Sequence, residues 1–209
     1  RLTNQDLERL MDTSDEWIRT RTGMFERHFA AEDEASSDLV TNAAHKALEM
    51  SGLRAKELDL IIVATVTPDH AYPSTACIVQ KNLGARNCMA FDISAGCSGF
   101  LYATHIAKQF VETGVVEHAL VAGVEILSRF VNWEDRATCV LFGDGCGAAV
   151  ISRCNSTDIS RIIDTEMEAD GTYGDLLIQP AGGSRMPPSE QTVREHLHSV
   201  HMEGNRIFK

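Results

Sequence analysis

Short apolar runs that alternate with amphipathic stretches constrain the fold of this chain more than any other feature. The run LDLIIVATV (58–66) is apolar almost throughout and rich in β-branched residues, as is typical of a strand buried on both faces of a sheet. Helical patterns at 73–83 and 98–114 separate the first three runs, which predicts βαβ crossovers. We therefore predict an α/β fold with a mixed, mainly parallel, five-stranded sheet flanked by helices. Its strands are expected at 58–66, 88–94, 118–125, 146–152 and 159–168.

Helix-start signals predict further elements. Patterns of the form [ST]-x-x-[DE] begin at Thr3 and Thr13, which predicts two short helices in NQDLERLM and DEWIRTRT. Ser36 or Ser37 is expected to cap the next helix, and Pro73 to open the one at 73–83. The stretch from 170 onward is rich in Gly, Pro and polar residues and predicts a long surface excursion.

Composition excludes several classes of protein. With 209 residues, 44% of them hydrophobic, the chain can bury a sizeable core. A net charge of −11 argues against nucleic-acid binding, which needs a basic face. No apolar run approaches the roughly 20 residues of a membrane helix, and the first ten residues do not resemble a signal peptide. The six cysteines include no C-x-x-C pair, which favours reduced thiols, no metal site and a cytoplasmic enzyme.

Cys97 is the candidate nucleophile. It lies in DISAGCSGFLYATH (92–105), where an apolar run meets a helical pattern. A position at a helix N-terminus favours the thiolate form of cysteine. Gly96 and Gly99 leave room for an acyl group, and the Cys97 N–H is a candidate oxyanion donor. The same pattern also fits an inert thiol buried in a tight strand–helix junction.

A cysteine hydrolase is a further alternative, because AGCSG differs from the G-x-S-x-G nucleophile elbow by Ala95 and by the nucleophile itself. Such an enzyme needs an acid and then a histidine later in the chain. The later histidines stand in no recognisable catalytic context; they are His105, His118, His196, His198 and His201.

Six collinear segments decide between these alternatives, because together they resemble β-ketoacyl-acyl-carrier-protein synthase III, a thiolase-fold condensing enzyme. They are DTSDEWIRTRTGMFERH (12–28), HAYPSTAC (70–77), DISAGCSGF (92–100), FGDGCGAAV (142–150), ADGTYGDLL (169–177) and HMEGNRIFK (201–209). The resemblance implies a half-domain at 1–155 that holds the nucleophile and the beginning of a second one at 156–209. It also implies that the family's first strand, and most of its second half-domain with the catalytic His and Asn, lie outside these residues.

The resemblance implies a role for each matching residue. Cys97 matches the nucleophile that accepts an acetyl group from acetyl-CoA. Trp17 and Arg136 match the pair that stacks on the CoA adenine, and Arg21 matches a residue near the CoA phosphates. Thr13 matches a further CoA contact, although helix capping explains it equally well.

Other matches concern the acyl pocket and the pantetheine tunnel. Tyr72 stands where the family usually has Phe, on a loop that crosses a dimer interface and shapes the partner's pocket. Leu141 and Phe142 match residues lining the acyl tunnel, beside a tight glycine turn in FGDGCGAAV. Gly204 and Asn205 match the Gly-Asn pair near the tunnel.

The implied function is acyl transfer at the start of fatty-acid synthesis: decarboxylative condensation of acetyl-CoA, or another short acyl-CoA, with malonyl-acyl-carrier protein. The family works as a homodimer, uses CoA thioesters as substrates and needs no cofactor or metal. Since the family's His and Asn are not matched, we expect these 209 residues alone to be acylated on Cys97 but not to condense. Two alternatives stay open: a related condensing enzyme that uses a longer or branched primer for polyketide or signal synthesis, and a catalytically incomplete binding fragment.

Overall fold

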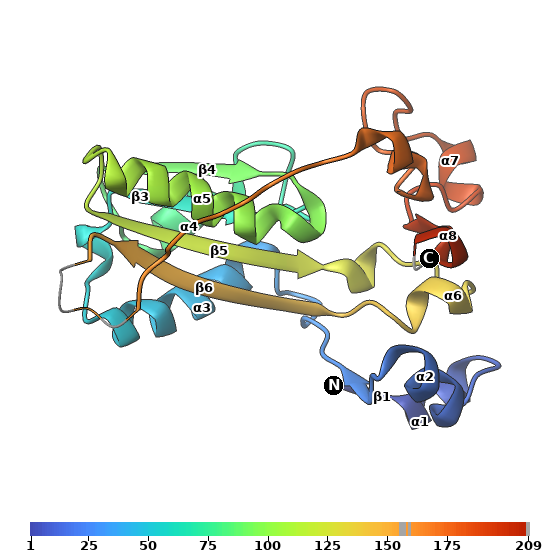
Figure 1. The fold of residues 1–209 in the computed structure, drawn as a ribbon. Helices are drawn as coiled ribbons and strands as arrows, with labels where there is room; N and C mark the ends of the chain where they lie inside the picture. Colours follow the sequence, from blue (N-terminus) through green and yellow to red (C-terminus); the bar gives the residue numbers. More distant parts are fainter. Residues whose placement is uncertain (155–157, 159, 208–209) are drawn as a thin grey trace. The chain divides into compact units, whose positions relative to one another are not determined.

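The computed structural model describes residues 1–154, 158 and 160–207. They form two compact units, each built from separate parts of the chain (Figure 1). The first unit comprises Arg1–Phe29, Ile126–Asp144 and Glu168–Lys209, and the second comprises Ala30–Glu125 and Gly145–Met167. These units follow packing, whereas the predicted boundary at 155–156 follows half-domains of the thiolase fold, so that boundary stays a prediction.

A four-stranded sheet forms the centre of the second unit, in the order β4-β3-β5-β6. Its strands are β3 (Leu60–Ala64), β4 (Met89–Ile93), β5 (His118–Ile126) and β6 (Asp144–Ser152). β3 pairs in parallel with both β4 and β5. The arrows of β5 and β6 point in opposite directions in Figure 1, which makes the sheet mixed. Every residue of β3 is buried, as its unbroken apolar run predicts.

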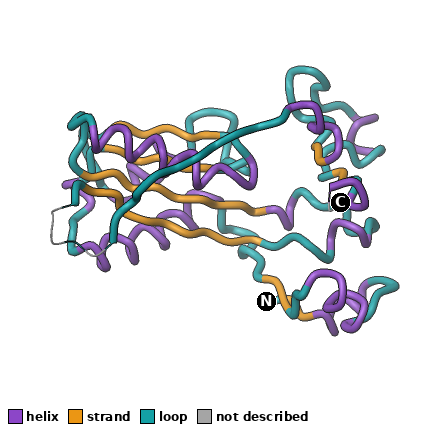
Figure 2. Tube along the Cα trace, viewed as in Figure 1, coloured by secondary structure: helices purple, strands orange, loops and turns teal. Residues whose placement is uncertain are grey.

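Helices cover both faces of this sheet, as Figure 2 shows. On one face, α3 (Ser36–Ser51) and α4 (Thr75–Leu83) pack against alternate residues of β3 and β5, among them Ile61 and Leu120. On the other face, Ala103, Ala107 and Val111 of α5 (Gly99–Glu112) pack against the alternate set that includes Ile62. The two-residue period of the strands therefore divides the core into two layers.

The first unit contains short elements around a small core. Its buried centre consists of Leu7, Ile18, Val131, Cys139 and Val140. The helices are α1 (Asn4–Leu10), α2 (Asp15–Thr22), α6 (Arg136–Cys139), α7 (Glu190–Arg194) and α8 (Gly204–Ile207). Two antiparallel pairs complete it: β1 (Leu2–Thr3) with β2 (Glu26–Arg27), and β7 (Leu177–Ile178) with β8 (His201–Met202). The segment after 170 lies mostly at the surface, as predicted, but it contains short helices and a strand pair, and Leu176 and Ala181 within it are buried.

The predicted helix starts are confirmed in part. The Thr3 side chain caps α1 and Asp6 returns the contact in a capping box, as predicted. In α2, however, Ser14 rather than Thr13 is the cap, and its Oγ accepts from the Trp17 N–H at 3.1 Å. The motif shifts by one residue because a cap needs extended backbone together with a side-chain oxygen within reach of the third N–H of the helix, and Ser14 has both.

Two other helices also begin one or two residues from the predicted position. α3 begins at Ser36 after Ala35, because the Ser36 and Ser37 hydroxyls bond to the loop after β3 instead of capping the helix. α4 begins at Thr75, capped by Ser74, and Pro73 lies outside it. At α3 a distant side-chain contact outweighs the local signal, whereas at α4 a local cap, Ser74, accepts from the Cys77 N–H and sets the start of the helix.

The predicted fifth strand at 159–168 is wrong over the residues that the structure describes, because 160–168 pair with no strand. Ile163 is 87% exposed, whereas the Thr165 hydroxyl contacts the His105 ring on α5. An apolar run forms a strand only where a neighbouring strand offers its backbone groups. The predicted turn in FGDGCGAAV is also wrong, since Asp144 and Gly145 begin β6. No helix within the described residues is long and apolar enough to cross a membrane.

Candidate functional site

Cys97 lies on the turn that joins the end of β4 to α5, in the second unit. The turn is a single 3-10 turn, Gly96–Ser98, and Cys97 is exposed on it. The hydrogen bonds of the turn run from the Ser98 N–H to the Ala95 carbonyl, 3.2 Å, and from the Gly99 N–H to the Gly96 carbonyl. Neither bond uses the Cys97 N–H. The predicted strand–turn–helix geometry is therefore present, and the thiol is open to solvent rather than buried.

Two glycines make this turn possible. Gly96 has φ +51°, a left-handed conformation that glycine adopts at little cost. Gly99 is the first residue of α5 and lies so close to β3 that an added Cβ would stand 3.0 Å from the Ala64 Cβ. The absence of a side chain at Gly99 thus lets α5 begin directly against the strand. Gly96 and Gly99 together determine the position of Cys97 relative to β3 and α5.

Three of the other cysteines, Cys88, Cys139 and Cys146, are less exposed than Cys97, whereas Cys77 and Cys154 are exposed as well. All six are free thiols. Cys139 has no exposed surface, and burial raises the pKa of its thiol. Burial also raises the pKa of Cys88, and that of Cys146 to about 12. A thiol with a raised pKa stays protonated near neutral pH and is a poor nucleophile.

We expect alkylation to distinguish the exposed cysteines from those whose thiol pKa is raised by burial. At pH 8 iodoacetamide should modify the exposed Cys77, Cys97 and Cys154 in the folded protein, while Cys139 and Cys146 react only after denaturation. The reason is that a thiol whose folded-state pKa is about 12 carries almost no thiolate at pH 8. Peptide mass mapping before and after denaturant measures this, and rapid modification of Cys146 in the folded state would contradict it.

In the first unit, Trp17 stands between two guanidinium groups. Trp17 and Arg21 are four residues apart on α2 and share one face of the helix. The Arg21 guanidinium carbon lies 4.5 Å from the Trp17 ring centroid, and that of Arg136, on α6, lies 4.9 Å away. Arg136 also donates to the Asp12 carbonyl oxygen at 2.6 Å. The structure thus brings the three predicted nucleotide-binding residues together, with the rings and guanidinium planes that stack on a purine.

Thr13, Leu141 and Phe142 lie in the same unit. Leu141, Phe142 and Trp17 pack against the buried cluster around Ile18 and Cys139. The Thr13 hydroxyl oxygen is buried and, within the part of the chain that the structure describes, has no hydrogen-bond partner. Because Ser14 takes the capping role, the alternative structural explanation for Thr13 does not hold. A buried hydroxyl without a partner is the unusual case in proteins.

The remaining predicted site residues, Tyr72, Gly204 and Asn205, are divided between the two units. Tyr72 is 86% exposed on the loop before α4, in the second unit. Gly204 and Asn205 are the first two residues of α8, in the first unit. The structure therefore brings Trp17, Arg21 and Arg136 into contact and places Cys97 and Tyr72 in the other unit.

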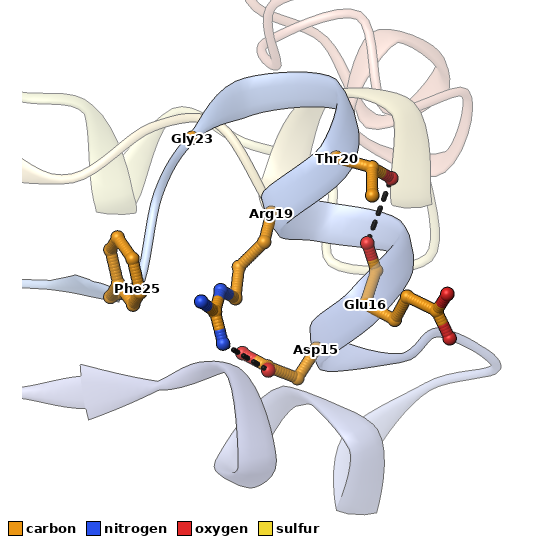
Figure 3. Close-up of a pocket in the computed structure, with 6 residues that line it drawn as sticks. All are labelled: Asp15, Glu16, Arg19, Thr20, Gly23 and Phe25. Atoms are coloured by element: carbon orange, nitrogen blue, oxygen red, sulfur yellow. Dashed lines mark hydrogen bonds and ion pairs between the residues drawn. The ribbon is translucent and has the colours of Figure 1, made fainter.

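A hollow of about 420 Å³ lies on the other face of α2 (Figure 3). Arg19 spans it, with its guanidinium 3.3 Å from the Asp15 carboxylate and 4.4 Å from the centroid of the Phe25 ring. Thr20 donates to the Glu16 carbonyl oxygen at 2.8 Å. None of the predicted site residues lines this hollow, and its cationic lining residue, Arg19, already pairs with Asp15. It is therefore separate from the Trp17 cluster, by which we mean Trp17, Arg21 and Arg136.

Sequence reasoning missed two carboxylates that organise the loop carrying Tyr72. Asp92 on β4 accepts hydrogen bonds from the Thr75 and Ala76 N–H groups at 2.6 and 2.7 Å. Asp69 accepts from the N–H and the hydroxyl of Ser37 at 2.8 and 2.6 Å. The signal for Asp92 was present, because it is an acidic residue inside the apolar run CMAFDIS, and a carboxylate within a strand pattern requires donors nearby.

Comparisons with known proteins agree with the predicted resemblance. Residues 91–171 match the family model described as 3-oxoacyl-[acyl-carrier-protein (ACP)] synthase III. The β-ketoacyl-[acyl-carrier-protein] synthase III of Caldanaerobacter subterraneus subsp. tengcongensis is 59% identical over 208 residues, covering 100% of this chain and 62% of the relative. The crystal structure of 3-oxoacyl-[acyl-carrier-protein] synthase III from Aquifex aeolicus VF5 is 48% identical, with a TM-score of 0.85 over 99% of this chain and 61% of that one.

A further solved structure is the priming β-ketosynthase from the R1128 polyketide biosynthetic pathway. It is 33% identical, with a TM-score of 0.85 over 99% of this chain and 60% of that one. The predicted thiolase-like α/β class is therefore confirmed, with the fifth strand as its error. The chain spans about three fifths of the length of the curated relatives that it matches. The fold, the family model over residues 91–171 and the identity over the whole chain together show that this chain is similar to the β-ketoacyl-acyl-carrier-protein synthases III.

Proposed function

We propose that the protein catalyses the first condensation of fatty-acid synthesis, joining acetyl-CoA and malonyl-acyl-carrier protein into acetoacetyl-acyl-carrier protein. The observation that carries the proposal is the exposed Cys97 on the β4–α5 turn of a chain that is 59% identical to a curated synthase III. Acetyl-CoA enters as a substrate, so the proposed reaction requires no separate cofactor and no metal.

In the first half-reaction, the Cys97 thiolate attacks the carbonyl carbon of acetyl-CoA. A bond forms between the sulfur and that carbon, and the carbonyl oxygen takes up the electron pair. The Cys97 N–H stands at the turn where an oxyanion donor is needed, and the first turn of α5 adds the positive end of its dipole. The tetrahedral intermediate then expels the CoA thiolate and leaves acetyl-Cys97, the covalent intermediate of a ping-pong mechanism.

In the second half-reaction, the malonyl group loses its free carboxylate as CO₂. The electron pair of the broken carbon–carbon bond forms an enolate, which attacks the acetyl-Cys97 carbonyl. The new carbon–carbon bond gives acetoacetyl-acyl-carrier protein, and Cys97 leaves as a thiolate ready for another acyl group. The whole of this half-reaction is proposed from the similarity to these synthases.

CoA recognition is proposed for the Trp17 cluster, with the adenine between Trp17 and Arg136 and the phosphates toward Arg21. Arg136 contacts the Trp17 ring, so adenine binding would require the guanidinium to move aside. The buried, unpartnered Thr13 hydroxyl is proposed as a further contact. Leu141 and Phe142 are proposed for the acyl tunnel, and Gly204 and Asn205 for the pantetheine arm.

A tryptophan substitution tests this assignment. We expect Trp17→Ala to raise the KM for acetyl-CoA about tenfold or more, since stacking on a base is worth about 1–3 kcal/mol. The change in kcat should be small, because in this assignment Trp17 contacts the adenine and not the reacting thioester. Trp133→Ala is the matched control: this tryptophan is in the same unit and contacts Phe29 edge-on. Equal KM changes in both variants would contradict the assignment.

A homodimer in the cytoplasm is the proposed working form. β4 is an edge strand of the sheet, and it carries the 42% exposed Met89. An open strand edge is a ready surface for pairing with a second copy. Because the net charge is −11 and carrier proteins are acidic, docking of the carrier protein would require a local basic patch.

A related enzyme with another primer is the second candidate, favoured by the likeness to the priming β-ketosynthase of the R1128 pathway. The test of both is the same experiment. The protein is incubated with acetyl-, isobutyryl-, butyryl- and hexanoyl-CoA in turn, and intact-mass spectrometry measures acylation. Acetylation that outpaces the other adducts supports the main proposal, a preference for a longer or branched group favours the alternative, and no adduct would reject both.

A further inference from the structure

The loop at residues 65–74, which we name the Tyr72 loop, joins β3 to α4 and combines an exposed tip with a base in which several side chains are buried. Residues 70–73 at the tip are exposed, whereas Thr65, Thr67 and the following Thr75 are buried. A tip that carries an 86% exposed aromatic ring thus stands on a base held by hydrogen bonds. The contacts of that base determine how firmly the ring is positioned.

Three carboxylates hold the base of the Tyr72 loop. Glu125 at the end of β5 accepts from the Val66 N–H at 2.9 Å and the Thr67 hydroxyl at 2.7 Å. Asp69, within the loop, ties it to Ser37 at the start of α3, and its own N–H donates to the Thr75 hydroxyl at 3.3 Å. Asp92 holds the C-terminal end of the loop, because it accepts hydrogen bonds from the first two N–H groups of α4.

Asp92 differs from the other two because of its place in the chain. It lies on β4 opposite Val63 of β3 and five residues before Cys97. Its two carboxylate oxygens accept separately, Oδ2 from Thr75 and Oδ1 from Ala76, and both of these residues are fully buried. N–H groups at the start of a helix have no partner within the helix, so this carboxylate is what satisfies them. The same short strand thus leads into the turn that carries Cys97 and holds the Tyr72 loop.

We infer that Asp92 is a positioning residue for primer selectivity: it fixes the Tyr72 loop to the strand that leads to Cys97. The inference rests on the proposed function and on the role that the resemblance implies for Tyr72, which is to shape the primer pocket of a second copy. A loosely held ring leaves the end of that pocket poorly defined and lets longer primers compete. Asp92 touches neither substrate in this proposal and acts only through the loop.

The test compares second-order rates of Cys97 acylation by acetyl-CoA and hexanoyl-CoA. In Asp92→Asn one acceptor oxygen becomes an amide that cannot accept, so one of the two buried N–H groups loses its partner. We expect the hexanoyl-to-acetyl ratio to rise about tenfold, equivalent to about 1.4 kcal/mol, while the acetyl rate changes little.

Asp59→Asn is the matched control. Asp59 precedes β3 at the other end of the strand, where its carboxylate accepts from the Glu117 and His118 N–H groups at 2.8 and 3.1 Å. Here too a carboxylate accepts from two successive backbone N–H groups, although both bond to the same oxygen, Oδ2, and among the described residues no hydrogen bond of Asp59 reaches the Tyr72 loop. Its hexanoyl-to-acetyl ratio should equal that of the wild type, and thermal unfolding of both variants shows whether stability differs.

A double substitution distinguishes a positioning role from a general loss of order. If Asp92 acts through Tyr72, then Asp92→Asn should add nothing to the ratio of Tyr72→Ala, because the side chain that it positions is gone. An unchanged ratio in an acylated Asp92→Asn variant, or additive effects in the double variant, overturns the inference and leaves the proposed function standing. A wild type that takes up no acyl group overturns the proposed function and this inference with it.

Discussion

Cys97→Ala should abolish acylation by acetyl-CoA completely, since the sulfur is the atom that forms the covalent bond. In the wild type, intact-mass spectrometry should detect a single acetyl adduct after incubation with acetyl-CoA, and hydroxylamine should remove it as expected for a thioester. In the variant no adduct should form at any concentration of acetyl-CoA. Peptide mapping of the wild type should locate the adduct within DISAGCSGF.

Exposure alone does not distinguish Cys97, so the control is another exposed thiol. Cys77 on α4 is exposed as well, and Cys77→Ala removes it without touching the β4–α5 turn. This variant should be acetylated at the wild-type rate. Acetylation that persists in Cys97→Ala and disappears in Cys77→Ala would move the nucleophile to α4 and reject the proposed mechanism.

Gly99→Ala should lower both stability and the rate of Cys97 acylation. The new Cβ would stand 3.0 Å from the Ala64 Cβ, so α5 must move away from β3 by a few tenths of an ångström. Overpacking of this kind costs about 1–3 kcal/mol, whereas alanine gains at most about 1 kcal/mol over glycine in a helix. The net expectation is a loss of about 1–2 kcal/mol in the free energy of unfolding, measured by chemical denaturation.

Two further variants identify the cause. Ala64→Gly in the Gly99→Ala background removes the opposing methyl group and should restore most of the acylation rate. Gly147→Ala on β6 is the control, because an added Cβ there meets nothing within 4 Å. A Gly99→Ala variant that is as stable and as active as the wild type would show that the close approach of α5 to β3 is not needed to position Cys97.

The core of the second unit was largely predictable because each of its elements carries a complete local signal. The run at 58–66 predicts β3, and Leu60–Ala64 is buried on both faces. Glycines at helix ends adopt left-handed conformations at Gly52 and Gly84, which close α3 and α4. Apolar periodicity and these C-terminal glycines act over a few residues, so they can be read from the chain without knowledge of its partners.

Two of the errors share one cause: the outcome depended on a partner distant in the sequence. The run at 159–168 has the composition of a strand, yet no strand pairs with 160–168 in the part of the chain that the structure describes. Ser36 and Ser37 have the composition of caps, yet their hydroxyls bond to Thr67 and Asp69. Backbone pairing and long-range hydrogen bonds depend on three-dimensional proximity, which a local pattern does not encode.

The candidate site divides in the same way. The sequence by itself determined the resemblance, through six collinear segments, and the resemblance led to the predicted roles of Cys97 and of Trp17, Arg21 and Arg136. Only the tertiary structure decided that Cys97 is exposed rather than buried, that two guanidinium groups lie on one indole ring, and that Asp92 holds the Tyr72 loop. The physical reason is that a motif specifies which groups are present, whereas burial, stacking and hydrogen bonding are properties of pairs of groups brought together by the fold.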